Sequence, residues 1–373
     1  MEQKINFIEF DKYFSEKYEE KYVGKEETDI YSLPAPYNPI TYIPSAIGIM
    51  LAKVLGGSIA DIYITGRIFN LITYLIMIAF ALKLLPYKHN IFLAISLMPM
   101  LLALASVYSM DGFTMGAVVV FIAYCLKLQK QEKISNKQLL ILSLAFGLVI
   151  CCKSMGYILV SFIILILPIK NILKNNTKQV LLLIGLTLLI LLINMGIMYM
   201  FQLEQISDPR VEGTNVKEQI QYIIENPDQY TKMIYSNVKG AFSDFTKIAY
   251  INAPMFFGEN YDNIFFYILI FIIYIGITDD SKNFNKRTKI IFIITAILTI
   301  IMTTTALYLS YTPVGKENVV GYQMRYMFPV LPLIMICLSS DKIKNKNTQE
   351  ESTYKVSYIS LLFLSLCLLG VIM

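Results

Sequence analysis

Four charged side chains lie at the ends of apolar segments, and their types are suited to binding and transferring a phosphate-linked group. Arg67, Lys153 and Arg325 are cationic, and Asp111 is anionic. Arginine offers a planar pair of donors to phosphate oxygens and lysine a compact charge, while a carboxylate can act as a general base or hold a cation in place. Ionisable residues within a membrane are costly, which makes these four residues candidates for a functional site.

Each of the four also has a simpler interpretation. Arg67 and Lys153 could extend to lipid phosphates at the membrane boundary, and Asp111 could be the N-cap of a helix over 112–128. For Asp111 alone the capping role is favoured. For the three cations a shared binding role is favoured, because they come from separate segments that converge on one face.

The elements that carry these residues follow from the composition. The chain has 373 residues, of which 56% are apolar and 16% charged, whereas soluble domains carry roughly 25% charged residues. This composition predicts an all-α polytopic membrane protein with about ten to eleven membrane helices. The predicted spans are 61–85, 91–108, 112–128, 138–152, 155–170, 179–202, 263–278, 289–311, 326–339 and 355–373. A further run, 41–57, either spans the membrane or enters it partway.

The distribution of Lys and Arg predicts the orientation. The connections 83–90, 127–138, 170–178, 279–289 and 341–355 hold 17 of the 32 Lys and Arg residues, which favour the cytoplasmic side. The hairpin tips 108–111 and 152–154, the loop 203–262 and the segment 311–325 are then extracytoplasmic. The four charged candidates therefore converge on the outer face of the cytoplasmic membrane.

Two hydrophilic parts accompany the single membrane domain predicted over 41–373. Residues 1–40 are acidic, and their aromatic residues recur at helical spacing, which predicts an amphipathic helix at the outer membrane interface. The loop 203–262 predicts two short helices, one over 215–225 with Ile220, Ile223 and Ile224 on one face, and one starting at Pro227. A lid on the membrane surface is favoured over a substrate-specific domain.

Several other chemistries lack support. No glycine-rich phosphate-binding motif occurs, so nucleotide binding is not expected. The five cysteines lack C-x-x-C spacing and His89 is the single histidine, so no cofactor is identified and a divalent cation has no supporting ligand set. The net charge of +5 reflects orientation in a membrane rather than binding to nucleic acid.

Four segments resemble a bacterial family of multi-spanning membrane proteins, domain of unknown function 2142. They are 37–44 with 66–70, 98–112, 153–157, and Gly321-Tyr322-Gln323-Met324-Arg325-Tyr326 with Pro329 and Pro332. The resemblance runs from about residue 37 to 339, and the order of the segments is more specific than any one of them. That family is similar to the GT-C glycosyltransferases, which implies a GT-C-like bundle.

The resemblance implies an enzyme that transfers a sugar from a polyprenyl-phosphate-linked donor to a cell-envelope glycan. The substrate-binding residues would be Arg67, Lys153, Arg325, Tyr42, Tyr322, Gln323 and Tyr326, with the tyrosines stacking on a sugar. The catalytic carboxylate would be Asp111 or Asp29. The resemblance also implies that a first membrane helix lies upstream of Met1, where the catalytic carboxylate could lie too, leaving this chain inactive. Two alternatives stay open: a flippase or transporter of lipid-linked saccharides, and a non-catalytic membrane protein.

Overall fold

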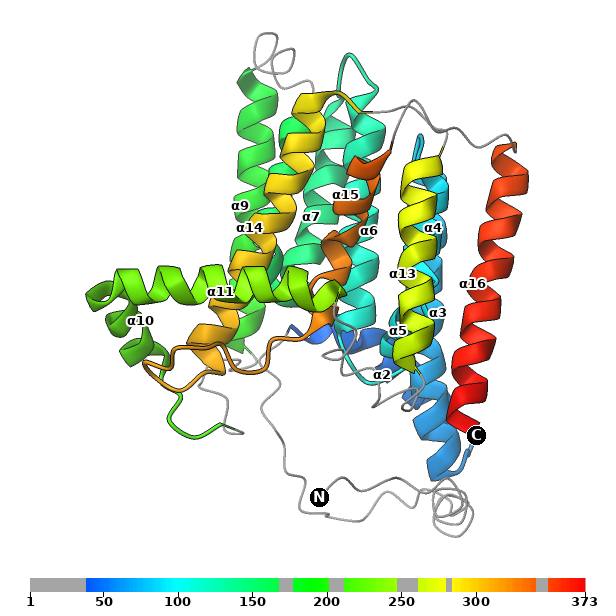
Figure 1. Cartoon of the computed structure of the whole chain (residues 1–373), viewed down its shortest axis with the longest axis horizontal. Helices are drawn as coiled ribbons and strands as arrows, with labels where there is room; N and C mark the ends of the chain where they lie inside the picture. The colour runs from blue at the N-terminus through cyan, green and yellow to red at the C-terminus, as the bar shows by residue number, and fades with distance from the viewer. Residues whose placement is uncertain are drawn as a thin grey trace.

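The described part of the chain is entirely helical in its regular structure. A computed structural model describes residues 38–167, 177–200, 211–246, 261–279, 284–339 and 348–372. Within them the longest helices lie side by side as a bundle (Figure 1). The predicted class, an all-α membrane protein, is confirmed. The acidic segment 1–40 lies outside the described residues, apart from 38–40.

Three described helices are long and apolar enough to cross a membrane, judged by length and composition. They are α3 (Ile59–Leu84), α6 (Asp111–Gln129) and α14 (Lys286–Ser310). Further helices of the bundle are α7 (Asn136–Tyr157), α9 (Thr177–Met200), α13 (Tyr261–Thr278) and α16 (Gln349–Ile372). Each of these helices overlaps a predicted apolar run.

The two ends of the bundle differ in charge. α6 ends and α14 begins at one end, at the top of Figure 1, together with the described parts of the connections 83–90, 127–138 and 279–289. We call this the basic end. The starts of α3 and α6 and the last turn of α14 lie at the opposite end. The basic connections therefore gather as predicted, while the side of the membrane that each end faces stays a prediction.

The helix α6 forms the centre of the bundle and is buried on nearly all sides. It packs against α3 and α7, and Val118, Phe121 and Cys125 are fully buried. Gly112 in its first turn lies so close to α5 (Pro99–Ala105) that a Cβ atom there would come within 2.5 Å of the Ala105 Cα. This close packing fixes the position of the first residue of α6, Asp111, at the opposite end.

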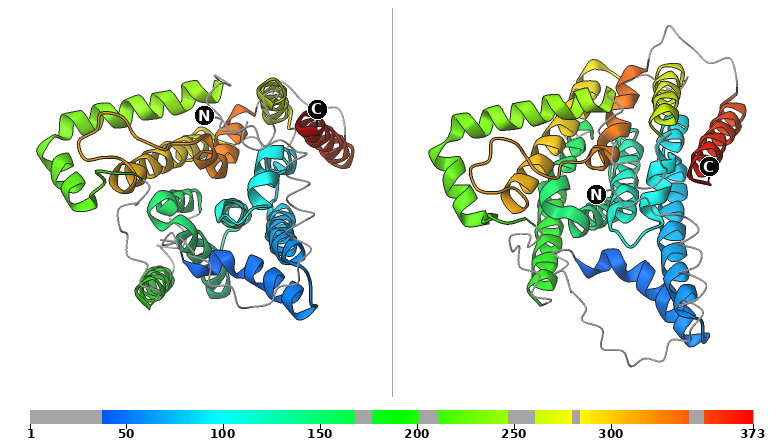
Figure 2. Two further views of the ribbon diagram at one scale, coloured as in Figure 1. Left: turned by 90° about the horizontal axis from the view of Figure 1, so that it is seen from below. Right: turned by 60° about the horizontal axis from the view of Figure 1, so that its bottom comes forward.

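The run predicted at 41–57 does not span the membrane. It forms a short 3-10 helix, η1 (Pro39–Tyr42), and α2 (Ile43–Val54). The 12 residues of α2 extend about 18 Å, which is too short for a hydrocarbon core of about 30 Å. Figure 2 shows α2, in dark blue, running across the opposite end of the bundle rather than along it. Of the two predicted arrangements, the structure therefore favours a helix at or partway into the membrane surface.

Prolines interrupt two of the predicted spans. The run 91–108 divides into α4 (His89–Ser96) and α5, because Pro99 has no amide hydrogen to donate and starts a new helix. Pro329 and Pro332 likewise lie at the starts of two short helices in the run 326–339. The four short helices of that run are η4 (Met324–Tyr326), η5 (Phe328–Val330), α15 (Leu331–Met335) and η6 (Ile336–Leu338).

The hairpin turn predicted at 152–154 is wrong. α7 continues through these residues to Tyr157, because neither Lys153 nor Ser154 prevents helical backbone geometry. A nine-residue 3-10 helix, η2 (Ile158–Ile166), then takes the place of the predicted run 155–170 and packs against α14 and α6. The change of direction therefore follows Tyr157, and Lys153 lies within the last turns of a helix.

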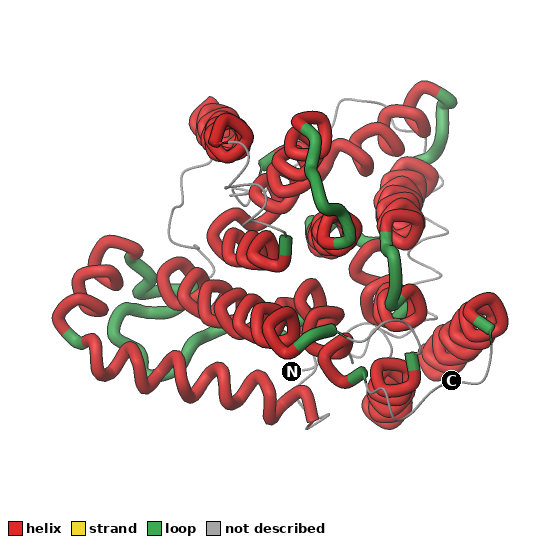
Figure 3. The backbone as a smooth tube through the Cα atoms, turned by 90° about the horizontal axis from the view of Figure 1, so that it is seen from above, coloured by secondary structure: helices red, strands yellow, loops and turns green. Residues whose placement is uncertain are grey.

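The loop 203–262 contains the two predicted helices, α10 (Val216–Glu225) and α11 (Pro227–Thr246), on one side of the bundle (Figure 3). α11 lies against α14 through polar contacts. The Tyr230 hydroxyl is 2.7 Å from Thr305 Oγ1, and Asn237 Nδ2 donates to Thr304 Oγ1 at 2.8 Å. Met233 of α11 is buried.

The apolar face predicted for α10 is mostly uncovered, with Ile223 alone half-buried. Ile220 and Ile224 are exposed, whereas Gln219 is buried and its side-chain oxygen accepts a hydrogen bond from the Gly315 amide at 3.1 Å. A polar contact to the segment 311–325 therefore holds α10, which hydrophobic periodicity alone cannot predict.

A buried amide pair joins the start of the described chain to α9. Asn38 Nδ2 donates to Asn194 Oδ1 at 2.7 Å, and both side chains are buried. We expect Asn194→Leu to lower the stability by about 1–3 kcal/mol, because the Asn38 amide loses its partner while buried. Thermal unfolding in detergent measures this loss. The neighbouring Ile193→Leu is the control, since Ile193 is exposed. Equal midpoints for Asn194→Leu and wild type would contradict the prediction.

Candidate functional site

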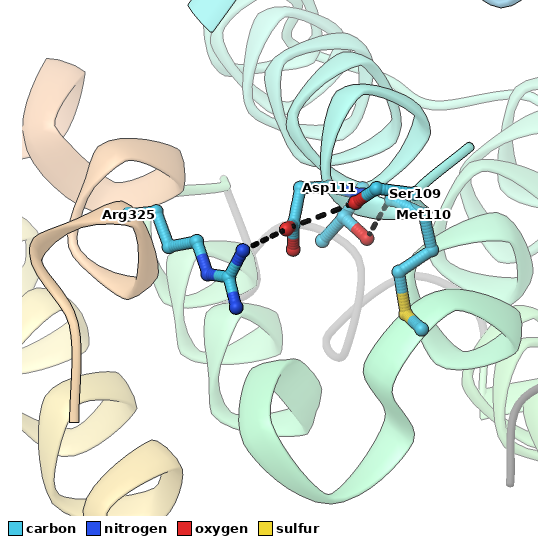
Figure 4. Close-up of polar contacts among 5 residues, drawn as sticks. Ser109, Met110, Asp111 and Arg325 are labelled. Carbon is cyan, nitrogen blue, oxygen red and sulfur yellow. Dashed lines mark hydrogen bonds and ion pairs between the residues drawn. The ribbon is translucent and has the colours of Figure 1, made fainter. Parts of the chain in front are cut away.

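An ion pair between Arg325 and Asp111 lies at the opposite end of the bundle. Arg325 Nη1 is 3.3 Å from Asp111 Oδ2, and the side chains are 31% and 14% exposed. Figure 4 shows the two side chains pointing toward each other from η4 and the start of α6. The sequence predicted that these two charges converge on one face, and the structure brings them into direct contact.

The position of Asp111 is set by the first turn of α6. The N-cap of α6 is Met110, so the predicted N-cap role of Asp111 is wrong by one residue. The Ser109 hydroxyl donates to Asp111 Oδ2 at 3.0 Å and accepts from the Asp111 amide at 3.0 Å (Figure 4). A carboxylate in the first turn is also favoured by the helix dipole. Asp111 is thus held in place to orient the Arg325 guanidinium.

Arg325 is positioned by the turn that precedes the broken helical run. Gly321 adopts a φ of 77°, and the Tyr311 ring occupies the space where a side chain would be. One residue after Arg325, the Tyr326 carbonyl accepts a hydrogen bond from the Tyr157 hydroxyl at 3.0 Å. The guanidinium also lies 5.5 Å from the centre of the Tyr326 ring, a favourable cation–π contact.

Arg67 holds the loop that leads into Asp111. Its Nε donates to the Ser106 carbonyl at 2.7 Å, and its guanidinium lies over the Tyr63 ring at 5.4 Å. Asn70, one turn further along α3, donates to the Val107 carbonyl at 2.9 Å. Among the described residues Arg67 makes no other hydrogen bond, so its terminal nitrogens can still donate to a ligand.

Tyr322 and Tyr326 flank the ion pair as an aromatic surface. Their ring centres are 5.7 Å apart, with the rings tilted. Burial raises the pKa of the Tyr322 hydroxyl, so this group stays neutral. Gln323 lies between them, and its carbonyl accepts from the Tyr326 amide at 3.1 Å. Two neighbouring aromatic rings beside a cation are suited to a sugar phosphate.

The other predicted site residues are less closely associated with the pair. Tyr42 lies in η1, which packs against α7 at the same end of the bundle. Lys153 lies in the last turns of α7, also at this end, but its side chain is outside the described residues, as is Asp29. Among the described residues, no three His, Cys, Asp or Glu side chains form a metal-binding group.

Sequence reasoning missed three residues that support the site: Ser109, Tyr63 and Tyr157. Each acts through a hydrogen bond or ring contact with a residue that was predicted or lies beside one. Ser109, two residues before Asp111, is the one for which the sequence held a signal, since a serine hydroxyl commonly bonds to backbone nearby. Tyr63 and Tyr157 required knowledge of which helices pack together.

The helical bundle and the paired charges at one end define an all-α membrane protein with its candidate site at a helix terminus. The chain belongs to the family described as predicted membrane protein (DUF2142), whose model matches residues 8–334. The resemblance found in the sequence is thereby confirmed at the level of the family. Neither a curated protein nor a solved structure matches the chain.

Proposed function

We propose that the protein is a membrane glycosyltransferase that takes a sugar from a polyprenyl-phosphate-linked donor and delivers it to a cell-envelope glycan. The site would face the outside of the cytoplasmic membrane, with the basic end on the inside. The observation that carries the proposal is the Arg325–Asp111 ion pair, at the end opposite to the basic connections. A cation held in a fixed direction beside aromatic rings suits the phosphate and sugar of such a donor.

The proposed reaction assigns a role to each part of the site. An acceptor hydroxyl forms a bond to the anomeric carbon, and the bond from that carbon to the phosphate oxygen breaks. The polyprenyl phosphate leaves with the electron pair, and the acceptor proton passes to a carboxylate. Arg325 and Arg67 would stabilise the charge on the leaving phosphate. Asp111 would orient Arg325. The carboxylate that accepts the proton would be either Asp111 or Asp29.

A flippase or transporter of lipid-linked saccharides is the second candidate function. Two interrupted helical runs favour it, α4 with α5 and η4 through η6, since broken helices commonly form transport sites near the membrane midplane. Against it, the Arg325–Asp111 pair lies at one end of the bundle rather than halfway along. The glycosyltransferase is therefore preferred.

One reconstitution experiment separates the candidates. The full-length protein is placed in proteoliposomes with a radiolabelled polyprenyl-phosphate sugar and a glycan acceptor. We expect label to appear on the glycan only when the protein is present. Movement of label between leaflets without transfer would instead identify the flippase. If neither process occurs, the glycosyltransferase proposal is wrong and a non-catalytic membrane role is favoured.

A further inference from the structure

A polar cavity lies at the basic end of the bundle, away from the Arg325–Asp111 pair. It has a volume of about 400 Å³ and lies between the end of α6, the end of η2 and the start of α14. Ile166 and Ile291 contribute apolar walls, and Tyr87 contributes an aromatic wall. This volume falls within the range of small-molecule sites, so the cavity can hold more than a single ion.

The charges that line this cavity are of one sign. Lys130 and Arg287 lie on its wall, and none of the described residues that line it is acidic. Arg287 is exposed and, among the described residues, makes no hydrogen bond or ion pair. The Lys130 ammonium lies 5.0 Å from the centre of the Tyr87 ring and donates to the Pro86 carbonyl at 3.3 Å. The cavity therefore presents two cations that no acidic side chain on its wall neutralises.

The neutral polar groups of the wall are fixed by one another. The Tyr87 hydroxyl donates to Gln129 Oε1 at 2.6 Å, and Gln129 Nε2 donates to Thr288 Oγ1 at 3.3 Å. Asn285 caps α14 by accepting from the Thr288 amide at 2.8 Å. These contacts join the connection before α4, the end of α6 and the start of α14. The wall is a preformed surface, and the start of a long helix adds a favourable dipole for an anion.

We propose that this cavity binds a phosphate-bearing anion, with Lys130 and Arg287 contacting the phosphate and Tyr87 and Ile291 contacting an apolar extension. The guanidinium of Arg287 supplies two parallel donors and Lys130 a point charge, which is the combination that phosphate groups favour. Two sources share this chemistry: the headgroup of an anionic membrane lipid, and a soluble phosphate compound. Basic recesses between membrane helices bind lipid headgroups in this way. The site is independent of the reaction proposed at the opposite end.

The test compares two double variants of the full-length protein with the same change in charge. Lys130→Gln with Arg287→Gln removes both cations of the cavity. Lys133→Gln with Lys137→Gln removes two exposed cations outside the cavity lining, one in the connection between α6 and α7 and one in the first turn of α7. Binding of phosphatidylglycerol and phosphatidylcholine to the purified protein is measured by native mass spectrometry. Inorganic phosphate and glycerol 3-phosphate are then offered as soluble competitors.

We expect the cavity variant to bind phosphatidylglycerol at least about tenfold more weakly than wild type, because each charge-assisted hydrogen bond contributes substantially to affinity. The control variant should differ by less than about twofold, because Lys133 and Lys137 do not line the cavity. If phosphatidylglycerol stays bound in the presence of both competitors, the ligand of the cavity is a lipid headgroup. If either competitor displaces phosphatidylglycerol, the ligand is a soluble phosphate compound. Equally weakened binding of phosphatidylglycerol in both double variants would show a general effect of the charge at the basic end and would overturn the proposal.

A single substitution keeps the test valid if the double variant folds poorly. Arg287→Gln removes no hydrogen bond among the described residues, so we expect its unfolding temperature to equal that of wild type. It should still weaken binding of phosphatidylglycerol several-fold, and Arg287→Lys should recover part of the loss because it restores the charge without the paired donors. Binding unchanged in Arg287→Gln would also overturn the proposal.

Discussion

Sugar transfer by the full-length protein is expected to fall by at least about 100-fold when Arg325 is replaced by glutamate, as for loss of a charge-stabilising donor in other active sites. The variant removes the cation proposed to bind the donor phosphate. In the wild type the Arg325 guanidinium lies 3.3 Å from the Asp111 carboxylate. The variant places a second carboxylate there, and the two negative charges would repel the donor phosphate. Transfer from radiolabelled polyprenyl-phosphate sugar in proteoliposomes measures the effect.

Two comparisons separate loss of binding from loss of folding. Lys316→Glu makes the same charge change at an exposed position of the segment 311–325, which also carries Arg325, and we expect transfer close to wild type. The exchange Asp111→Arg with Arg325→Asp keeps an ion pair but moves the cation onto α6. It should not restore transfer, and its unfolding temperature should fall slightly because the contacts of Asp111 with Ser109 and the helix dipole are lost. Wild-type transfer by Arg325→Glu would show that Arg325 does not bind the donor.

A large effect on stability and on transfer together is expected from Gly112→Ala. A Cβ atom at this position would lie 2.5 Å from Ala105 Cα and 2.8 Å from Ala105 Cβ, so α5 and α6 must move apart. Overpacking of this kind costs about 1–3 kcal/mol, and here the obstacle is backbone, which cannot rotate away. Thermal unfolding in detergent should show a lower midpoint. Transfer should fall as well, because the adjacent Asp111 would be displaced.

The matched control for Gly112→Ala is Gly185→Ala in α9. No atom lies within 4 Å of the position that a Cβ would take at Gly185, and alanine is favoured over glycine in helices by roughly 1 kcal/mol. We expect this variant to unfold at the same temperature as wild type or slightly above it. If both substitutions lower the midpoint equally, close packing between α5 and α6 is not the cause of the loss.

Hydropathy and charge distribution predicted the helices of the bundle and the gathering of basic connections at one end, because burial in lipid requires long apolar runs. They failed where local backbone geometry decides the outcome. η2 is a 3-10 helix of nine residues that composition does not distinguish from an α-helix. Likewise, α10 is held by Gln219 rather than by its isoleucines, a contact that depends on the distant Gly315.

The candidate site was predictable as a convergence but not as a set of contacts. The distribution of Lys and Arg predicted that Arg67, Asp111 and Arg325 lie on one face. Only the packing of the helices shows that Arg325 pairs with Asp111, whereas Arg67 holds the loop at Ser106. The cavity at the basic end was not predicted at all. Its cations, Lys130 and Arg287, belong to connections whose charge is explained by orientation alone, so the sequence contained no reason to separate them from their neighbours.

The central helix α6 sets the distance between the two proposed sites. Its 19 residues extend about 28 Å, close to the thickness of the hydrocarbon core, about 30 Å. Asp111 begins this helix and Lys130 directly follows it, so one stiff and mostly buried helix connects the two sites. Ligands at the two sites cannot touch each other. Any influence of an anion at the basic end on binding of the donor at the opposite end is then a coupling free energy between two separate sites, and it acts equally in both directions.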